Sequence, residues 1–131
     1  MWRSVAAVCV GGSVGCLLRW CLGVWFSGTG SVVPLGTLTA NLLGGYIVGI
    51  AVAFFALNNS LAPEWRVLII TGFCGGLTTF SSFSAEVVLM LRQDRVLWAF
   101  ATVALHLGGS LLMTFAGFAT VAGLKGSAST P

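Results

Sequence analysis

Charged residues divide the chain into four long apolar stretches, because residues 4–18, 20–63, 67–85 and 96–124 contain no Lys, Arg, Asp or Glu. A helix that crosses the hydrocarbon core of a bilayer needs roughly 20 apolar residues. The second stretch has 44 residues, enough for two such helices, and the sequence SGTGSVV at 27–33 offers Gly and Ser residues that would separate them. The pattern therefore predicts four membrane-spanning helices in an all-α protein.

The expected helices cover about 4–26, 35–57, 64–91 and 96–123, in a single membrane domain over 1–131. Pro34 and Pro63 fall at helix starts, where the missing proline N–H is harmless. Glu64 would lie in the first turn of the third helix, where the helix dipole favours a negative charge. The opening residues MWRSVAAVCV are interpreted as the first helix rather than as a secretory signal, since three more apolar segments follow.

The composition agrees with a membrane protein, since 57% of the residues are hydrophobic and only 7% are charged. The net charge of +3 is spread over loop ends and forms no basic stripe, so nucleic acid is not an expected partner and the lipid bilayer is. The cysteines have no CxxC or mixed Cys/His spacing, and we expect buried free thiols at Cys9, Cys16, Cys21 and Cys74.

Basic residues do not favour one orientation in the membrane. With four spans, Arg3, Arg66 and Lys125 lie at one membrane face and Arg19, Arg92 and Arg95 at the other. Lys and Arg normally concentrate at the cytoplasmic ends of spans. The balance favours a chain that inserts in both orientations and forms an antiparallel dimer; the alternative is a single orientation set by other features.

Polar residues inside the fourth span form a stripe. Four of them recur at every fourth position, and they are Thr102, His106, Ser110 and Thr114. Residues four apart lie on the same side of a helix, so the stripe could line a narrow pore. Hydrogen bonds between helices are the alternative interpretation, which Gly108 and Gly109 would support by allowing close packing.

Two further spans contain isolated polar side chains. In the second span, Thr37 and Asn41 are one turn apart, and the two N–H donors of Asn41 would suit an anion or a hydrogen bond to another helix. Arg19 follows the glycine-rich sequence GGSVG in the first span. Its guanidinium would either reach the membrane surface or supply positive potential at the vestibule of a pore.

The third span contains the sequence GFCGGLTTFSSFSAE at 72–86, in which Gly75 and Gly76 weaken helix propensity. A break at membrane depth would free backbone carbonyls that need partners in protein, in a cavity or on a bound cation. Phe80 and Phe83 are three residues apart and share a helical face, and their ring edges carry partial positive charge that can face an anion. Taken alone, such a pair is more often part of a core.

Three of these motifs together resemble one known family. GFCGGLTTFSSF resembles the third-helix signature of the Fluc (CrcB) fluoride channels, and GTLTANLLGG and GGSVGCLLRW resemble the second-helix and first-helix motifs of that family. The motifs occur in the family's order in a chain with four expected spans. In the fourth span His106 occupies a stripe position that is tyrosine in some relatives, which leaves its role open.

The resemblance implies a dual-topology antiparallel homodimer in the bacterial inner membrane, with the third helix broken and two fluoride pathways shared between the subunits. It implies a structural sodium ion at the two-fold axis, held by the backbone carbonyls of Gly75 and Thr78. The implied fluoride pathway consists of Asn41, Phe80, Phe83, His106, Ser110 and Thr114. A polar group at one pore end would consist of Thr37, Ser81 and Glu86, with Arg19 at the vestibule; Glu86 could instead be an interfacial carboxylate beside Arg92.

The function implied by this resemblance is passive export of cytoplasmic fluoride, which limits its toxicity and needs no enzymatic chemistry. One alternative is a small four-helix proton-coupled multidrug transporter, but such a protein needs a carboxylate in its first span and this span has none. The other alternative is a structural membrane subunit, which would explain the glycines but not Asn41 or the polar stripe.

Overall fold

Helices account for nearly all of the described chain. The computed structural model describes residues 1–128, so residues 129–131 of the expected domain lie outside it. The elements are α1 (Trp2–Phe26), α2 (Leu35–Leu57), α3 (Pro63–Arg66), the π-helical segment η1 (Val67–Cys74), α4 (Gly75–Leu77), α5 (Phe80–Arg92) and α6 (Val96–Ala128). Within residues 1–128, four stretches are long and apolar enough to cross a membrane: Trp2–Phe26, Leu35–Leu57, Pro63–Arg92 and Val96–Ser127. This number of spans confirms the expectation from the hydropathy pattern.

The helix ends follow local sequence signals. Pro34 directly precedes α2, and Pro63 is the first residue of α3 with Glu64 in its first turn. The turn between α5 and α6 is tight, because Asp94 takes a positive φ of 56° and the Arg95 amide donates to the Met90 carbonyl. Helix α6 continues to Ala128 rather than ending near 123, since no proline or left-handed residue interrupts its final turns.

The third span is not one continuous helix. Thr78 has ψ 154° and Thr79 has φ −149°, so the backbone is extended between α4 and α5. Gly75 and Gly76 themselves remain helical, although their low helix propensity was the sequence signal for a break. The extended residues follow directly after Leu77, which is fully buried against Leu22 and Ala40.

Glycines allow the helices to approach each other closely. A Cβ atom added to Gly117 of α6 would lie 2.8 Å from the Ile50 amide nitrogen and 3.0 Å from the Gly49 Cα of α2. A Cβ on Gly15 of α1 would lie 2.7 Å from the Leu77 amide nitrogen. Small residues at such contacts let helices associate through backbone packing where no water drives association.

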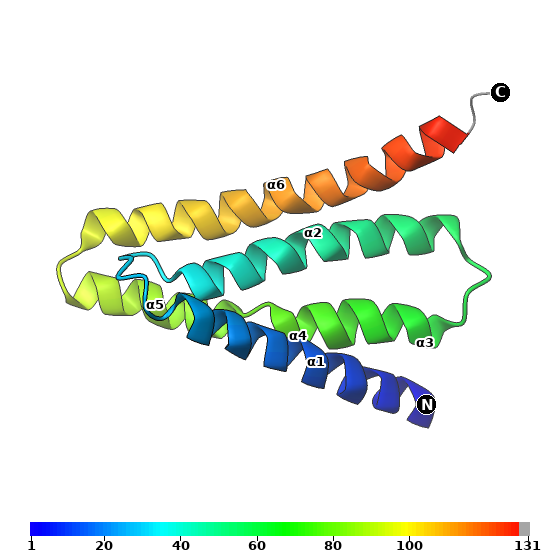
Figure 1. Cartoon of the computed structure of the whole chain (residues 1–131), viewed down its shortest axis with the longest axis horizontal. Helices are drawn as coiled ribbons and strands as arrows, with labels where there is room; N and C mark the ends of the chain where they lie inside the picture. Colours follow the sequence, from blue (N-terminus) through cyan, green and yellow to red (C-terminus); the bar gives the residue numbers. More distant parts are fainter. Residues whose placement is uncertain (129–131) are drawn as a thin grey trace.

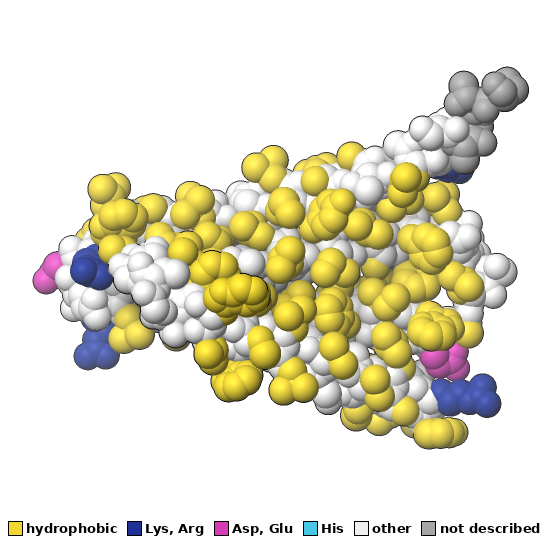
Figure 2. Space-filling view, in the orientation of Figure 1, with side chains coloured by type: hydrophobic (Ala, Val, Ile, Leu, Met, Phe, Trp, Pro, Cys, Tyr) yellow, Lys and Arg dark blue, Asp and Glu magenta, His cyan; other side chains and the backbone are white. Residues whose placement is uncertain are grey.

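The bundle brings α2 alongside α6, and α1 alongside η1 and α4 (Figure 1). The start of α1 and the end of α6 lie at the same end of the molecule (Figure 1). The charged side chains gather at the two ends of the molecule (Figure 2). Hydrophobic side chains cover the surface between those ends. Cys74 is buried, but Cys9, Cys16 and Cys21 are exposed on the outer surface of α1, so the expectation that all the thiols are buried was wrong.

The glycine contact between α2 and α6 gives the first testable prediction. Gly117→Ala should destabilise the protein by about 1–3 kcal/mol, because the added methyl group overlaps the α2 backbone. Gly123→Ala, in the same helix, is the matched control, since nothing lies within 4 Å of a Cβ there. Thermal unfolding in detergent compares the two variants with the parent. Equal melting temperatures for all three proteins would contradict this account of the contact.

Candidate functional site

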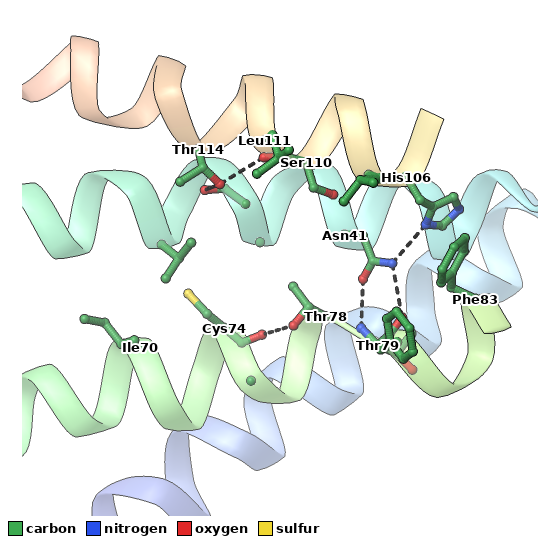
Figure 3. Close-up of a pocket in the computed structure, with 16 residues that line it drawn as sticks. Asn41, Ile70, Cys74, Thr78, Thr79, Phe83, His106, Ser110, Leu111 and Thr114 are labelled. Atoms are coloured by element: carbon green, nitrogen blue, oxygen red, sulfur yellow. Dashed lines mark hydrogen bonds between the residues drawn. The ribbon is translucent and has the colours of Figure 1, made fainter. Parts of the chain in front are cut away.

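A cavity of about 450 Å³ lies between α2, η1, α5 and α6, beside the extended residues Thr78 and Thr79 (Figure 3). It brings together residues from three different spans. All the residues expected along the fluoride pathway line it, namely Asn41, Phe80, Phe83, His106, Ser110 and Thr114. Gly75 and Thr78, the expected metal-binding positions, line the same cavity. The fold therefore brings residues that are far apart in the sequence to one cavity.

Asn41 is tied to the extended segment. Its Oδ1 accepts from the Thr79 amide at 2.8 Å, and its Nδ2 donates to the Thr79 carbonyl at 3.1 Å. The same Nδ2 lies 3.0 Å from His106 Nδ1 (Figure 3). An amide group has two N–H donors, and both are engaged here. Of the two interpretations that the sequence left open, the structure contains the hydrogen bonds between segments.

The aromatic residues form a connected row. Phe80 and Phe83 make an edge-to-face contact with ring centroids 5.5 Å apart. Phe83 in turn stacks on His106, with centroids 4.7 Å apart and an interplanar angle of 28°. Phe80 has 78% of its surface exposed, whereas His106 has 4%. One end of the row is therefore buried in the chain and the other end is open.

The polar stripe of α6 divides into cavity and core positions. Ser110 and Thr114 line the cavity, and the Thr114 hydroxyl is within donating distance of the Gly45 and Ser110 carbonyls. Ser110 Oγ has no hydrogen-bond partner among residues 1–128 and remains available to a ligand. Thr102 is fully buried and donates to Met90 Sδ at 3.5 Å, so it belongs to the contact between α5 and α6.

The polar group expected at one pore end is only partly assembled. Thr37 Oγ1 donates to Glu86 Oε1 at 2.5 Å, and both residues line a second cavity of about 380 Å³ beneath the loop between α1 and α2. Ser81 lies apart from them and contacts Thr79 Oγ1 at 3.2 Å. Glu86 Oε2 is buried and has no hydrogen-bond partner in the described part of the chain.

Arg19 contacts the end of α4. Its Nε donates to the Gly76 carbonyl at 3.0 Å, and one of its terminal nitrogens lies 3.6 Å from Cys16 Sγ. A cation at the C-terminal end of a helix interacts favourably with the exposed carbonyl groups there. The contact therefore stabilises the helix end that precedes the extended segment.

The carbonyls of Gly75 and Thr78 both lose their helical donors at the interruption. In a continuous α-helix they would accept from the Thr79 and Ser82 amides, respectively. Here the Thr79 amide donates to Asn41 Oδ1 and the Ser82 amide donates to Thr79 Oγ1. Two backbone oxygens close to the cavity are thus available to a cation. Within residues 1–128 no group of three His, Cys, Asp or Glu side chains could hold a metal ion.

Thr79 is the functional position that the sequence analysis missed. Its backbone N–H and carbonyl bind the two polar atoms of the Asn41 amide, and its side chain caps α5 by accepting from the Ser82 amide. A threonine directly before the first residue of a helix is a recognisable N-cap signal. The partner of the two backbone groups, 38 residues earlier in the chain, left no such signal.

Comparison with known proteins identifies the family. The family described as CrcB-like protein, Camphor Resistance (CrcB), matches residues 6–118. The fluoride-specific ion channel FluC of Pseudomonas putida (strain W619) is 58% identical over 120 residues, covering 92% of this chain and 94% of the relative. The protein of the same name from Nitrosomonas europaea is 53% identical over 127 residues, covering 97% of this chain and 100% of the relative.

A third relative, the fluoride-specific ion channel FluC of Albidiferax ferrireducens, is 60% identical over 117 residues, or 89% of each chain. These matches cover all four apolar helices. The resemblance drawn from the three motifs is confirmed, and the chain is a multi-pass membrane protein. It belongs to the CrcB-like family.

Proposed function

We propose that this protein is a passive fluoride channel of the bacterial inner membrane, through which cytoplasmic fluoride leaves the cell. The observation that carries the proposal is the single cavity onto which Asn41, both phenylalanines, His106 and the two hydroxyl residues of α6 converge. The relatives support it, because proteins up to 60% identical to this chain are named fluoride-specific ion channels.

The cavity suits a small anion that must exchange water for weak contacts. A pore has to bind an ion well enough to admit it and weakly enough to release it. The unpaired hydroxyl of Ser110 offers a hydrogen-bond donor. The ring edges of Phe80 and Phe83 carry a modest positive charge, and the contact between the two rings restricts their movement. The Asn41 amide would contribute by sharing the N–H groups that now contact Thr79 and His106.

The competing transporter function lacks its central residue. Helix α1 contains no acidic side chain that could bind protons and cationic drugs in turn. Apart from the thiols, Arg19 is the ionisable residue nearest the middle of α1, and its Nε donates to the Gly76 carbonyl. A structural membrane subunit would have no use for the unpaired hydroxyl and open aromatic edge that line the cavity.

The pathway is expected to be completed by a second copy in antiparallel orientation. Phe80 lies at the cavity but has 78% of its surface exposed, which leaves one side of the pathway without a wall. A two-fold axis would apply the same surface of a second subunit to this side. The equal distribution of basic residues between the two ends supports insertion in both orientations. The extended segment of the third span would then lie near the middle of the membrane.

A structural sodium ion fits the free carbonyls of Gly75 and Thr78. Hard cations of this kind prefer oxygen ligands, and two carbonyls from each of two subunits would supply four. Both oxygens lose their helical donors at the interruption, so they need another partner in an apolar environment. The ion would supply positive charge at the subunit contact, and the conduction steps belong to the cavity residues.

Fluoride flux tests the function directly. The purified protein in liposomes should release fluoride and retain chloride, and Phe80→Ile or Phe83→Ile should fold as dimers with flux reduced by about tenfold or more. Phe54→Ile is the matched control, because Phe54 also forms an edge-to-face pair at 5.5 Å, with Phe55. If the parent releases no fluoride, the channel function is wrong; if the two pathway variants conduct at the parent rate, the ring edges have no role.

Orientation variants test the antiparallel dimer. Asn59→Lys with Ser60→Lys adds positive charge at the end that carries Arg66, and Gly28→Lys with Gln93→Lys adds it at the opposite end. Each pair should force one orientation and abolish most fluoride flux, while coexpression of the two pairs should restore it. Thiol labelling from one side of the membrane verifies orientation. Full flux from either variant alone, inserted in a single verified orientation, would refute the antiparallel arrangement.

Sodium dependence tests the carbonyl site. The dimer should melt at a higher temperature in sodium than in N-methylglucamine, with a gain of about 2.7 kcal/mol at a hundredfold excess over the Kd. Thr78→Ala should keep this difference, because it removes the hydroxyl that donates to the Cys74 carbonyl but leaves its own carbonyl in place. A parent protein with the same melting temperature in both salts would remove sodium from the proposal.

A further inference from the structure

The backbone N–H and carbonyl of Thr79 fix the orientation of the Asn41 amide. The Thr79 N–H can only donate and its carbonyl can only accept. Because the first lies 2.8 Å from one end of the Asn41 amide and the second 3.1 Å from the other, the oxygen and the nitrogen of that amide are assigned without ambiguity. Flipping the amide would oppose two donors at one end and two acceptors at the other.

This orientation determines the protonation of His106. The remaining N–H of the Asn41 amide points to His106 Nδ1 at 3.0 Å, so Nδ1 must act as the acceptor. In a neutral imidazole the other nitrogen then carries the proton. Stacking on Phe83 holds the ring plane, and the side chain is only 4% exposed, so the ring has little freedom to turn.

The N–H group created in this way has no partner. His106 Nε2 is buried and makes no hydrogen bond within residues 1–128. A buried donor without an acceptor is costly, so such an atom marks a place where a ligand or an ordered water binds. Because the rest of the chain already buries His106, a second subunit would have little access to this atom. The acceptor must be small.

We propose that Asn41 is a positioning residue, which transmits the geometry of the Thr79 peptide to His106 and fixes Nε2–H as a donor for dehydrated fluoride. The proposal rests on the channel function above and assigns roles within it: His106 contacts the ion through Nε2–H, and Asn41, besides the contact with fluoride proposed above, orients His106. If the proton were on Nδ1, Nε2 would present a lone pair that repels an anion. The backbone of Thr79, at the interruption of the helix, thereby determines that His106 Nε2 is a hydrogen-bond donor and not an acceptor.

A second buried polar atom without a partner within residues 1–128 lies on α5. Glu86 follows Phe83 by one turn of α5, and its Oε2 is also buried without a partner in the described chain. An ordered water molecule could equally satisfy His106 Nε2–H, since water accepts as well as donates. The two ligands can be distinguished at the His106 N–H group, because only fluoride binding depends on the concentration of added fluoride.

Nuclear magnetic resonance can observe this group without ambiguity, because the chain contains one histidine. The full-length dimer, labelled with ¹⁵N-histidine, should give a spectrum with the proton on Nε2 and none on Nδ1. Added sodium fluoride should shift the Nε2–H resonance, and the same concentration of sodium chloride should not. A proton on Nδ1 would overturn the positioning role, and an Nε2–H resonance that ignores fluoride would assign the site to water and overturn the donor role.

Variants separate positioning from folding. Asn41→Leu should release the constraint, so that both protonated forms of His106 appear, and fluoride flux should fall by about tenfold to a hundredfold. Asn58→Leu is the matched control, since Asn58 donates only to the exposed Phe54 carbonyl and lies outside both cavities. An Asn41→Leu dimer that keeps the Nε2–H form would overturn the proposal.

A second pair of variants serves if Asn41→Leu does not fold. His106→Gln retains an N–H donor, and His106→Phe retains only the stacked ring, so flux should be at least about tenfold higher in the Gln variant. Equal flux in the two variants would count against the donor. If the parent shows the expected Nε2–H spectrum but conducts no fluoride, the channel function fails while the assignment of Asn41 as the residue that fixes the tautomer stands.

Discussion

The two hydrogen bonds between the Asn41 amide and the Thr79 peptide are the contact on which the rest of this structure depends. An apolar environment offers no water to an interrupted helix, so the freed backbone groups need partners within the protein. Asn41 satisfies the N–H and the carbonyl of one residue, Thr79, at once, at 2.8 and 3.1 Å. With both backbone groups of Thr79 satisfied, the third span can turn from α4 into α5 and still keep its helices packed against α1, α2 and α6.

Close packing of the helices makes this contact possible. Asn41 has a short side chain, and it reaches Thr79 because α2 and the third span approach closely beside Gly44, against which the Thr78 methyl group packs. On the other side of α2, Gly49 and Gly117 bring α6 equally close, which places His106 within reach of the same amide. A bundle held apart by larger side chains would leave the amide, the peptide and the imidazole each without a partner.

The same arrangement divides the polar groups into those that are satisfied and those that are free. Thr114, Thr102 and the Thr79 side chain contact the protein itself. Ser110 Oγ, His106 Nε2 and two backbone carbonyls do not, within the residues described. Because an unpaired buried polar group is costly, these atoms identify where an ion would be stabilised. The donors belong to residues of the proposed anion pathway, while the carbonyls suit a cation, so a single interruption of one helix accounts for both proposed sites.

The sequence alone determined the number of spans, their approximate bounds and the family, since these follow from local properties: long uncharged stretches, prolines at helix starts and three motifs of consecutive residues. It also identified six residues that line the cavity, through the polar side chains in apolar spans and the resemblance of the motifs. Only the tertiary structure decided what these residues contact. Asn41 meets Thr79 and His106 across 38 and 65 positions, and Arg19 meets Gly76 across 57, distances over which no periodicity carries information. Hydrogen bonds depend on angstrom-scale distances between segments, and those distances are set by the packing of whole helices.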